Sequence, residues 1–302
     1  MTEGGKTYAV AGVSLATAEA IVARLRAAVE STGATGFGAF AGLHPLDDQR
    51  LLAASTDSVG TKLILARERG ALRVCGADLA AHCINDVITT GAEPLMLLDY
   101  VAANRIELEQ VAELVDGAAD VCRAAGVALV GGETAELPGV YREQELDFAG
   151  TCVGVVDRDS VIDGSRVEEG DAIIGLQSAG VHANGFTLVR EVLRAEDYDG
   201  EDLLAPTRLY LDDVRTLKRL CDVHAFAHVT GGGVLGNLER VIPDGLCARI
   251  DWDAWERPPV FRWLARHVDE HELRRVFNLG IGFAAVVPYP GEQLVIGRTE
   301  RA

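Results

Sequence analysis

Segments with apolar residues at helical spacing alternate along the chain with short apolar runs. Apolar residues at helical spacing predict two helices, at residues 14–32 and 104–126, and each ends at a glycine. A third helix is predicted over residues 78–90, and Gly91 ends it. Short apolar runs between and after these helices predict strands at residues 51–56, 72–77, 93–102, 127–130 and 172–176. Near the C-terminus, residues 274–288 have the pattern of a strand, a glycine turn and a second strand.

Both halves of the chain show this alternation, with glycines at the ends of the strands. Such a pattern predicts an α/β or α+β fold in which the loops at the strand termini bind ligands. A change of composition over 155–171 and a length of 302 residues, above the usual single-domain range, predict two domains. We place the N-terminal domain at residues 1–160 and the C-terminal domain at residues 161–302.

Two glycine-rich segments are candidates for ligand contact. Residues 33–42 hold four glycines together with Phe37 and Phe40, and the backbone freedom of glycine lets such a segment wrap a ligand. A flexible linker is the alternative, but phenylalanine is unusual in a solvated linker. The second segment, TGGG at 230–233, offers backbone N–H groups before a predicted helix, where an anion can bind.

The stretch STDSVGTKL, residues 55–63, has the composition of a phosphate-binding loop. Its order differs from a Walker A motif, since an aspartate precedes the glycine, threonine and lysine. These four residues are Asp57, Gly60, Thr61 and Lys62. An acid at this position suggests that a cation lies between the protein and a phosphate.

Three carboxylates, Asp57, Asp78 and Glu133, lie at predicted strand ends or at a helix start. Alone, each of them fits a helix cap or a turn. Together, beside glycines and hydroxyls, they predict a site for Mg²⁺, which binds oxygen ligands and joins carboxylates to the phosphates of a nucleotide. The helix that Asp78 begins carries further polar residues on the same face: His82, Asn85 and Asp86.

His182 and Asn184 lie in a glycine-flanked loop, SAGVHANG at 178–185. A histidine in such a loop can move a proton or stabilise a negative oxygen during catalysis. The alternative is a loop histidine bonded to a nearby carbonyl, and the spacing does not decide between the two. His228, which precedes the TGGG segment, is interpreted as structural.

The net charge of −18 argues against nucleic-acid backbones and anionic membranes as partners. An anionic nucleotide then needs local cations, which is a further reason to expect Mg²⁺. No apolar run approaches the roughly 20 residues of a membrane helix, and the first residues lack the pattern of a signal peptide. The six cysteines form no C-x-x-C pair, which predicts free thiols in a reducing cytoplasm.

Seven motifs resemble, in their order, those of the phosphoribosylformylglycinamidine cyclo-ligase (AIR synthetase) family. They are STDSVGTKL, GADLAAHCIND, GAEPLMLLDYVA, LVGGETAELPGVY, SAGVHANGFTLVR, HVTGGGVLGNLERVIP and FNLGIG, and they cover nearly the whole chain. The resemblance implies two α/β domains per chain, a homodimer whose N-terminal domains pair into a shared β-barrel, and ATP bound in the cleft at the dimer interface. It also implies the reaction, an ATP-dependent closure of formylglycinamidine ribonucleotide to aminoimidazole ribonucleotide in purine biosynthesis, through phosphorylation of the formyl amide oxygen.

The resemblance further implies roles for single residues. It implies Mg²⁺ ligands at Asp57, Asp78 and Glu133, and catalysis by Lys62, His182 and Asn184. It implies ATP contacts at Gly36, Phe37, Gly38, Asp57, Gly60, Thr61, Lys62, Asp78 and Asn85. It implies substrate contacts at Glu133, Thr134, Glu136, His182, Asn184, Gly231 and Gly232.

The chain departs from the family pattern at Ser58, where glycine is usual, and at Ser14, where aspartate is usual. Its tail is shorter, and the VIG segment at 295–297 is expected to supply the final strand. Two alternatives stay open: a catalytically silent paralogue that binds nucleotide, and a related small-molecule kinase such as thiamine-monophosphate kinase. The retained acids favour an active enzyme over the silent paralogue.

Overall fold

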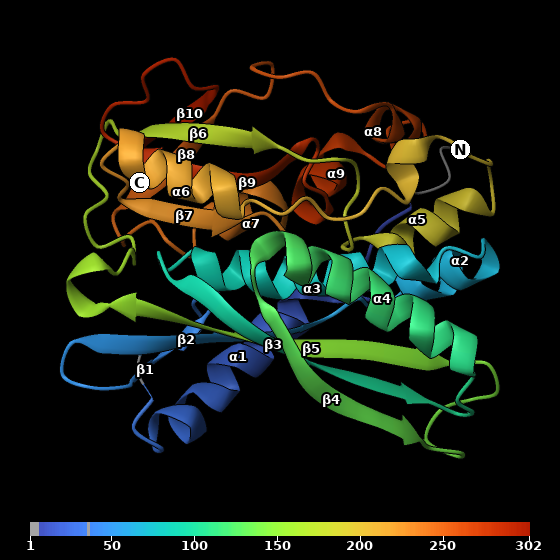
Figure 1. The fold of residues 1–302 in the computed structure, drawn as a ribbon. Helices are drawn as coiled ribbons and strands as arrows, with labels where there is room; N and C mark the ends of the chain where they lie inside the picture. Colours follow the sequence, from blue (N-terminus) through green and yellow to red (C-terminus); the bar gives the residue numbers. More distant parts are fainter. Residues whose placement is uncertain (1–5, 35–36) are drawn as a thin grey trace.

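The computed structural model describes residues 6–34 and 37–302, whose strands form two five-stranded sheets. The N-terminal sheet has the order β1-β2-β5-β3-β4 (Figure 1). Its strands are β1 Gly42–Pro45, β2 Arg50–Ser58, β3 Glu93–Ala103, β4 Ala128–Glu136 and β5 Leu146–Asp157. Neighbouring strands are antiparallel except β3 and β4, which are parallel and are joined by a helix.

Helices lie on both faces of this sheet (Figure 1). On the side of the C-terminal half lie α2 (Lys62–Glu68), α3 (Leu72–Ile88) and α4 (Leu108–Ala125), and on the opposite side lies α1 (Leu15–Glu30). Gly126, the glycine predicted to end the long helix, has the left-handed backbone (φ 71°) that closes α4. The two helices predicted from apolar spacing are therefore present.

Helix α3 corrects the prediction of a strand over 72–77. These residues form the first turns of α3, which packs on α4 at a glycine from each helix. A Cβ atom at Gly76 would lie 1.9 Å from Leu114 O, and one at Gly117 would meet the α3 backbone at 2.0 Å. The close contact between α3 and α4 requires small residues in this segment. The resulting short apolar run has the composition of a strand. Asp78 consequently lies inside a helix rather than at its start.

The C-terminal sheet has the order β7-β9-β6-β10-β8, and its neighbouring strands are all antiparallel. Its strands are β6 Ala172–Gln177, β7 Ala225–His228, β8 Leu246–Ile250, β9 Ile281–Val287 and β10 Val295–Arg301. Its helices are α5 Phe186–Leu193, α6 Leu211–Leu220, α7 Gly233–Leu238, α8 Pro259–Leu264 and α9 Glu270–Val276, with short 3₁₀ helices at Arg158–Ser160 and Glu201–Leu203. The VIG segment supplies the expected strand, because it begins β10 between β6 and β8.

Residues 274–288 contain the end of a helix and a strand, so the prediction of two strands is wrong in its first part. Helix α9 begins after Asp269, whose side chain accepts a hydrogen bond from the backbone N–H of Glu272. Its last turn holds Arg274 and Arg275, where positive charge interacts favourably with the helix dipole. These capping signals favour a helix more strongly than the β-branched and aromatic residues that follow favour a strand.

A continuous apolar core joins the two halves. It contains Leu79 and Ile84 of α3 together with Tyr210, Phe226 and Phe283 of the C-terminal half. The architecture is the mixed α/β fold that the alternating pattern predicted. The boundary placed between residues 160 and 161 lies in the connection from β5 to β6 and stays a prediction. Among the described residues, no helix is both long and apolar enough to cross a membrane.

Candidate active site

Lys62 and Asp78 form an ion pair inside the contact between the two halves. Their Nζ and Oδ2 atoms are 2.7 Å apart, and both side chains are fully buried. Lys62 Nζ also donates to the carbonyls of His182 (2.8 Å) and Ala205 (3.1 Å), while Asp78 Oδ1 accepts from the backbone N–H and the hydroxyl of Thr207. The three protons of the ammonium group therefore all have acceptors inside the protein.

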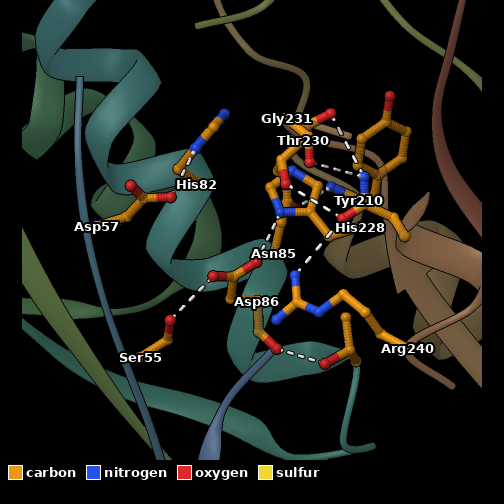
Figure 2. A network of polar contacts seen from close by, with 12 residues as sticks. Ser55, Asp57, His82, Asn85, Asp86, Tyr210, His228, Thr230, Gly231 and Arg240 are labelled. Atoms are coloured by element: carbon orange, nitrogen blue, oxygen red, sulfur yellow. Dashed lines mark hydrogen bonds and ion pairs between the residues drawn. The ribbon is translucent and has the colours of Figure 1, made fainter. Parts of the chain in front are cut away.

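Asn85 belongs to the same contact. Its amide donates to Arg208 O (2.9 Å) and accepts from Tyr210 N (3.0 Å) (Figure 2), and the residue is fully buried. We call Lys62, Asp78, Asn85 and Thr207 the polar seam.

The polar seam bears on several predicted roles, which stay predictions. Here the Lys62 ammonium group is paired with Asp78, and the Asn85 amide is bonded to Arg208 and Tyr210. A ligand that took these groups would leave a buried charge or a buried backbone group without its partner, which is costly.

His182 lies against the polar seam. Its ring is buried, and Nε2 accepts from the backbone N–H groups of Ala179 (3.2 Å) and Arg208 (3.4 Å). Its backbone is left-handed (φ 66°), a conformation uncommon for residues other than glycine. Burial, with the nearby histidines and cations, lowers the pKa of His182 well below its usual value. The ring is therefore neutral, and since Nε2 accepts, Nδ1 carries the proton. Its catalytic role stays a prediction.

The loop of His182 and the TGGG segment lie side by side. A Cβ atom at Gly231 would lie 3.7 Å from Asn184 Nδ2. Gly232 has a left-handed backbone (φ 103°) and starts α7, as the sequence predicted for a glycine loop before a helix. The structure thus brings together three of the predicted substrate-binding residues, Asn184, Gly231 and Gly232.

A second polar group lies between β2, α3 and β7 (Figure 2). Asp57 Oδ2 is 3.1 Å from His82 Nδ1, and Asp86 Oδ1 is 2.8 Å from His228 Nδ1. Ser55 donates to Asp86 Oδ2 (2.9 Å). The two imidazole rings meet edge to face, with centroids 4.9 Å apart. We call these five residues the acid–histidine cluster.

The charges of the acid–histidine cluster are coupled. Burial raises the pKa of Asp57, but the hydrogen bond and charge of His82 outweigh it and hold that pKa below its usual value. Burial lowers the pKa of His82, but the hydrogen bond and charge of Asp57 outweigh it and raise that pKa. For His228, burial outweighs the contact with Asp86, and its pKa is lowered. Asp57 and His82 therefore favour an ion pair, whereas His228 favours the neutral form.

Three buried ring nitrogens in this region have no hydrogen-bond partner within the described part of the chain: His82 Nε2, His182 Nδ1 and His228 Nε2. An unsatisfied buried polar group costs about 1–3 kcal/mol, so native proteins rarely leave such groups without a water or a ligand. The Asp57 side chain is 34% exposed, which gives a ligand access to the edge of the cluster. The cluster therefore has unused polar capacity at two ring nitrogens, whereas in the polar seam the buried Asp78 Oδ2 has the Lys62 ammonium group as its one partner among the described residues.

Three of the predicted substrate-binding residues lie on β4, the edge strand of the N-terminal sheet: Glu133, Thr134 and Glu136. Strand pairing runs from Asp57 on β2 through β5 and β3 to Gly132 on β4. Three strand spacings amount to roughly 14 Å, so Asp57 and Glu133 of one chain do not share a metal ion. Asp78 is taken up by Lys62, and no three acidic, histidine or cysteine side chains of the described residues are grouped as metal ligands. The predicted Mg²⁺ ligand set is thus not assembled.

A pocket of about 860 Å³ lies between α1, β2 and α7. Its walls include predicted contact residues from both glycine-rich segments: Phe37, Gly38, Gly231 and Gly232. Ser55 and Thr56 of β2 form the wall beside the acid–histidine cluster. Gly36, also predicted to contact ATP, lies outside the described residues. Two segments about 190 positions apart thus line one pocket, whose volume is typical of small-molecule sites.

Two arginines stand on the walls of this pocket. The guanidinium of Arg240 lies 3.8 Å from the centre of the Phe40 ring and donates to two backbone carbonyls of the glycine-rich segment. Burial lowers the pKa of Arg240. On α1, the guanidinium of Arg26 lies 5.8 Å from the centre of the Phe37 ring. The pocket therefore offers two guanidinium groups, of which Arg26 also pairs with Glu30 (3.4 Å).

Gly60 and Thr61, predicted to contact ATP, line a different cavity. They follow β2, whereas the 860 Å³ pocket touches β2 before Asp57. Thr61 Oγ1 lies 2.9 Å from Thr187 Oγ1 on α5. The structure therefore separates the residues of the STDSVGTKL stretch into two sites on either side of Asp57.

Comparison with known proteins identifies the family. The sequence models of the AIR synthase related protein, N-terminal domain and C-terminal domain, match residues 38–156 and 168–297. A phosphoribosylformylglycinamidine cyclo-ligase of Synechococcus sp. (strain CC9605) is 47% identical over 311 residues, which cover 96% of this chain and 90% of that protein. This chain belongs to the cyclo-ligase family. The cyclo-ligase of Synechococcus sp. (strain CC9902) is 45% identical with the same coverage.

Solved structures share the fold of this cyclo-ligase family member. Thiamine monophosphate kinase from Aquifex aeolicus superposes with a TM-score of 0.65 at 15% identity, over 96% of both chains. AaThiL complexed with AMPPCP and TMP gives 0.68 at 17% identity, over 92% of this chain and 90% of that chain. T. maritima PurL complexed with ADP gives 0.58 at 20% identity, over 89% of this chain and 43% of that chain. At these identities the likeness shows the fold alone.

Sequence reasoning missed several residues of the site. Asp86 and His82 were placed on the polar face of α3 but were given no role, and His228 was interpreted as structural. Their shared helical face and the position of His228 before a glycine loop were the available signals. Arg26 and Arg240 had no sequence signal, because each is a single arginine on an ordinary amphipathic segment.

Proposed function

We propose that this chain catalyses the ATP-dependent closure of formylglycinamidine ribonucleotide to aminoimidazole ribonucleotide, a step of purine biosynthesis. The observation that carries the proposal is the 47% identity, over 96% of the chain, to a protein named as the cyclo-ligase. An amide oxygen is a poor leaving group, so the amidine nitrogen does not displace it unaided. Phosphorylation of the formyl oxygen by ATP makes the leaving group phosphate, and the ring then closes.

The nucleotide belongs, in this proposal, in the pocket between α1, β2 and α7. Two glycine-rich segments offer backbone N–H groups there, and Arg26 and Arg240 offer positive charge, the donors that polyphosphates need. Solved structures of the shared fold are complexes with AMPPCP and with ADP, which supports nucleotide binding. Asp57 lies just beyond this pocket along β2, where the transferred phosphoryl group has to reach the substrate.

The residues present fit Mg²⁺ that arrives with the nucleotide. Mg²⁺ in such sites takes one or two protein carboxylates and completes its coordination with phosphate oxygens and water. At the edge of the acid–histidine cluster the Asp57 side chain is 34% exposed, whereas both Asp86 oxygens are bonded, to Ser55 and to His228. We propose that Asp57 helps to hold Mg²⁺, which would supply charge neutralisation when bound.

On the substrate side, Asn184 and His182 take different parts in the proposal. The Asn184 amide beside Gly231 orients the substrate. The neutral His182 ring has Nε2 committed to two backbone N–H groups, so it serves as a donor from Nδ1 rather than as a base. A donor there stabilises negative charge that develops on an oxygen.

We further propose a homodimer that pairs through the outer face of the N-terminal sheet. On β3, Leu95, Leu98 and Tyr100 are 46%, 40% and 37% exposed, and Val130 on β4 is 54% exposed. An exposed apolar patch of this kind indicates an interaction surface. Within one chain, Glu133 and Asp57 lie roughly 14 Å apart. In a dimer, Glu133 of one copy can approach Asp57 of the other. Light scattering at the assay concentration tests the dimer.

The proposed location is the cytoplasm. The six cysteines, all in the described part of the chain, are free thiols, as predicted, and free thiols are typical of reducing compartments.

Turnover with oxygen-18 in the formyl group tests the proposed reaction. The label should appear in inorganic phosphate, one label for each ring closed. Unlabelled phosphate beside ring product would rule out the phosphorylated intermediate. Nucleotide binding without any ring product would favour the silent paralogue, and phosphorylation of thiamine monophosphate would favour the kinase.

A further inference from the structure

A second cavity, of about 500 Å³, opens between α2, α5 and the loop over 141–147. We call it the α2–α5 cavity. It shares no lining residue with the proposed nucleotide pocket. Gly60 and Thr61 form its floor after β2, and Arg67 of α2, Tyr141 of the loop and Arg190 of α5 are among its other lining residues. Because α2 and α5 belong to different halves of the chain, the cavity straddles the contact between them.

The geometry of two helices brings the two arginines to one cavity. The hydroxyl contact of Thr61 with Thr187 joins the start of α2 to the first turn of α5. Arg67 lies six residues after Thr61, roughly 9 Å along α2, and Arg190 lies three residues after Thr187, roughly 5 Å along α5. Both arginines are half-buried and line the same space.

Two arginines and three carboxylates line this cavity. Within the part of the chain that the structure describes, neither guanidinium has an ion-pair or hydrogen-bond partner, whereas Arg69, the residue that follows α2, contacts Asp197 (3.7 Å). The carboxylates of the cavity are Glu143 and Glu145 of the loop and Asp147 at the start of β5. Glu145 accepts a hydrogen bond from the Arg142 backbone N–H, and Asp147 accepts one from the Phe148 backbone N–H. The arginines therefore come from two helices, and the carboxylates come from the loop and β5.

We propose that the α2–α5 cavity binds the phosphate group of the ribonucleotide substrate, with Arg67 and Arg190 as specificity-determining residues. The proposal rests on the proposed cyclo-ligase function. Guanidinium groups bind phosphate oxygens through paired hydrogen bonds, and neither arginine has to give up an ion pair to do so among the described residues. The Tyr141 hydroxyl, whose pKa is raised by burial and by Asp147, stays protonated and is a further donor.

The position of this cavity along β2 suits a two-substrate reaction. The nucleotide pocket contacts residues 54–56, the α2–α5 cavity contacts residues 60 and 61, and Asp57 lies between them. At most roughly 10 Å of extended chain separates Asp57 from Gly60. The substrate carries its phosphate at one end and its formyl and amidine groups at the other. A phosphate held by the arginines thus places the reacting end toward Asp57 and the nucleotide.

The kinetic test uses the double variant Arg67→Gln/Arg190→Gln with Mg-ATP and formylglycinamidine ribonucleotide. Loss of a charge-assisted hydrogen bond costs about tenfold in affinity, so KM for the ribonucleotide should rise about 10²-fold, with KM for ATP unchanged. The control Arg275→Gln/Arg298→Gln removes the same charge from exposed positions outside both cavities and should leave both KM values unchanged. An unchanged ribonucleotide KM in the folded double variant overturns the proposal.

A binding test separates this proposal from the proposed reaction. Ribose 5-phosphate should bind the wild-type chain in a calorimetric titration, ribose should not, and the double variant should lose the binding about 10²-fold. Binding that depends on both arginines without any turnover would support the phosphate subsite and overturn the cyclo-ligase function. Equal binding of ribose 5-phosphate by wild type and double variant would overturn the subsite whatever the turnover.

Single variants keep the test decisive should the double variant not fold. Arg67→Lys and Arg190→Lys keep the charge but lose the planar fork, so each should raise KM for the ribonucleotide about three- to tenfold, less than the matching Gln variant. Equal KM values for wild type and both Lys and Gln variants would overturn the proposal.

Discussion

The polar seam and the acid–histidine cluster are both built on one face of α3, yet they differ in how fully their polar groups are bonded. In the polar seam, the Lys62 ammonium group has three acceptors, Asp78 is bonded to Lys62 and Thr207, and Asn85 is bonded to Arg208 and Tyr210. In the cluster, His82 and His228 each keep a buried ring nitrogen without a partner among the described residues. Polar groups whose hydrogen bonds are complete hold the two halves together. Polar groups with unused bonding capacity can bind a ligand.

The difference arises from what the C-terminal half places opposite each part of the helix. Opposite the polar seam stand backbone N–H and C=O groups of residues 205–210, which complete its hydrogen bonds. Opposite the cluster stands the His228 side chain, which bonds Asp86 through one nitrogen only. The same sequence motif therefore serves two purposes within two turns of one helix.

Substitution of Lys62 by methionine should have the largest effect. It leaves the buried Asp78 carboxylate unpaired, so the free energy of unfolding should fall by about 3–5 kcal/mol, as urea denaturation can measure. The double variant Lys62→Met/Asp78→Leu removes the orphaned charge and should recover part of the loss. A stable Lys62→Met chain with a raised KM for ATP would reverse the comparison and return Lys62 to the phosphates.

Substitution of Asp57 by asparagine should act on activity rather than on stability. Loss of a carboxylate that neutralises the transferring phosphoryl group should lower kcat/KM about 10²–10³-fold, which is about 3–4 kcal/mol, and should raise the Mg²⁺ requirement. The free energy of unfolding should fall by only about 1 kcal/mol, since the asparagine oxygen can still contact His82 Nδ1. Asp116→Asn, at an exposed surface pair with Arg73, is the matched control and should leave turnover unchanged.

Substitution of Asn85 by alanine should show the opposite profile. It leaves Arg208 O and Tyr210 N without their partner, so the free energy of unfolding should fall by about 1–3 kcal/mol. KM for ATP should stay as in the wild type. A stable variant with weaker ATP binding would place Asn85 with the ligand groups after all.

The smallest effect is a pH dependence of stability from His182. Its folded pKa lies below its unfolded value, so only the unfolded state takes up this proton as the pH falls below about 6.5. Stability is complete above that pH and is lost toward the folded pKa, by at most about 1.4 kcal/mol per pH unit. His182→Asn, which tolerates the left-handed backbone, should reduce the slope of unfolding free energy between pH 6.5 and 5. An unchanged slope would show that the ring is not held neutral.

The pattern of apolar residues predicted secondary structure correctly where a helix is amphipathic. It predicted secondary structure wrongly where close packing determines which residues are present. It predicted the helix that ends at Gly126 and the strand that carries Asp57. It failed at residues 72–77, because the contact of Gly76 with α4 requires small residues that local propensity cannot distinguish from a strand. Likewise, the strand predicted over 93–102 has one exposed face, because α3 packs on its other face.

The sequence by itself determined the family, the alternation of strands and helices, and the motifs whose residues lie near the site. It could not determine which of the motif's polar groups are free to bind a ligand. That choice depends on partners from the other half of the chain, more than 100 residues away, as in the contacts of Lys62 with His182 and of Asp86 with His228. Hydrogen bonds and burial are properties of groups in space, so only the tertiary structure decided that Lys62 and Asp78 hold the halves together while Asp57 and Asp86 face a site with unused bonding capacity.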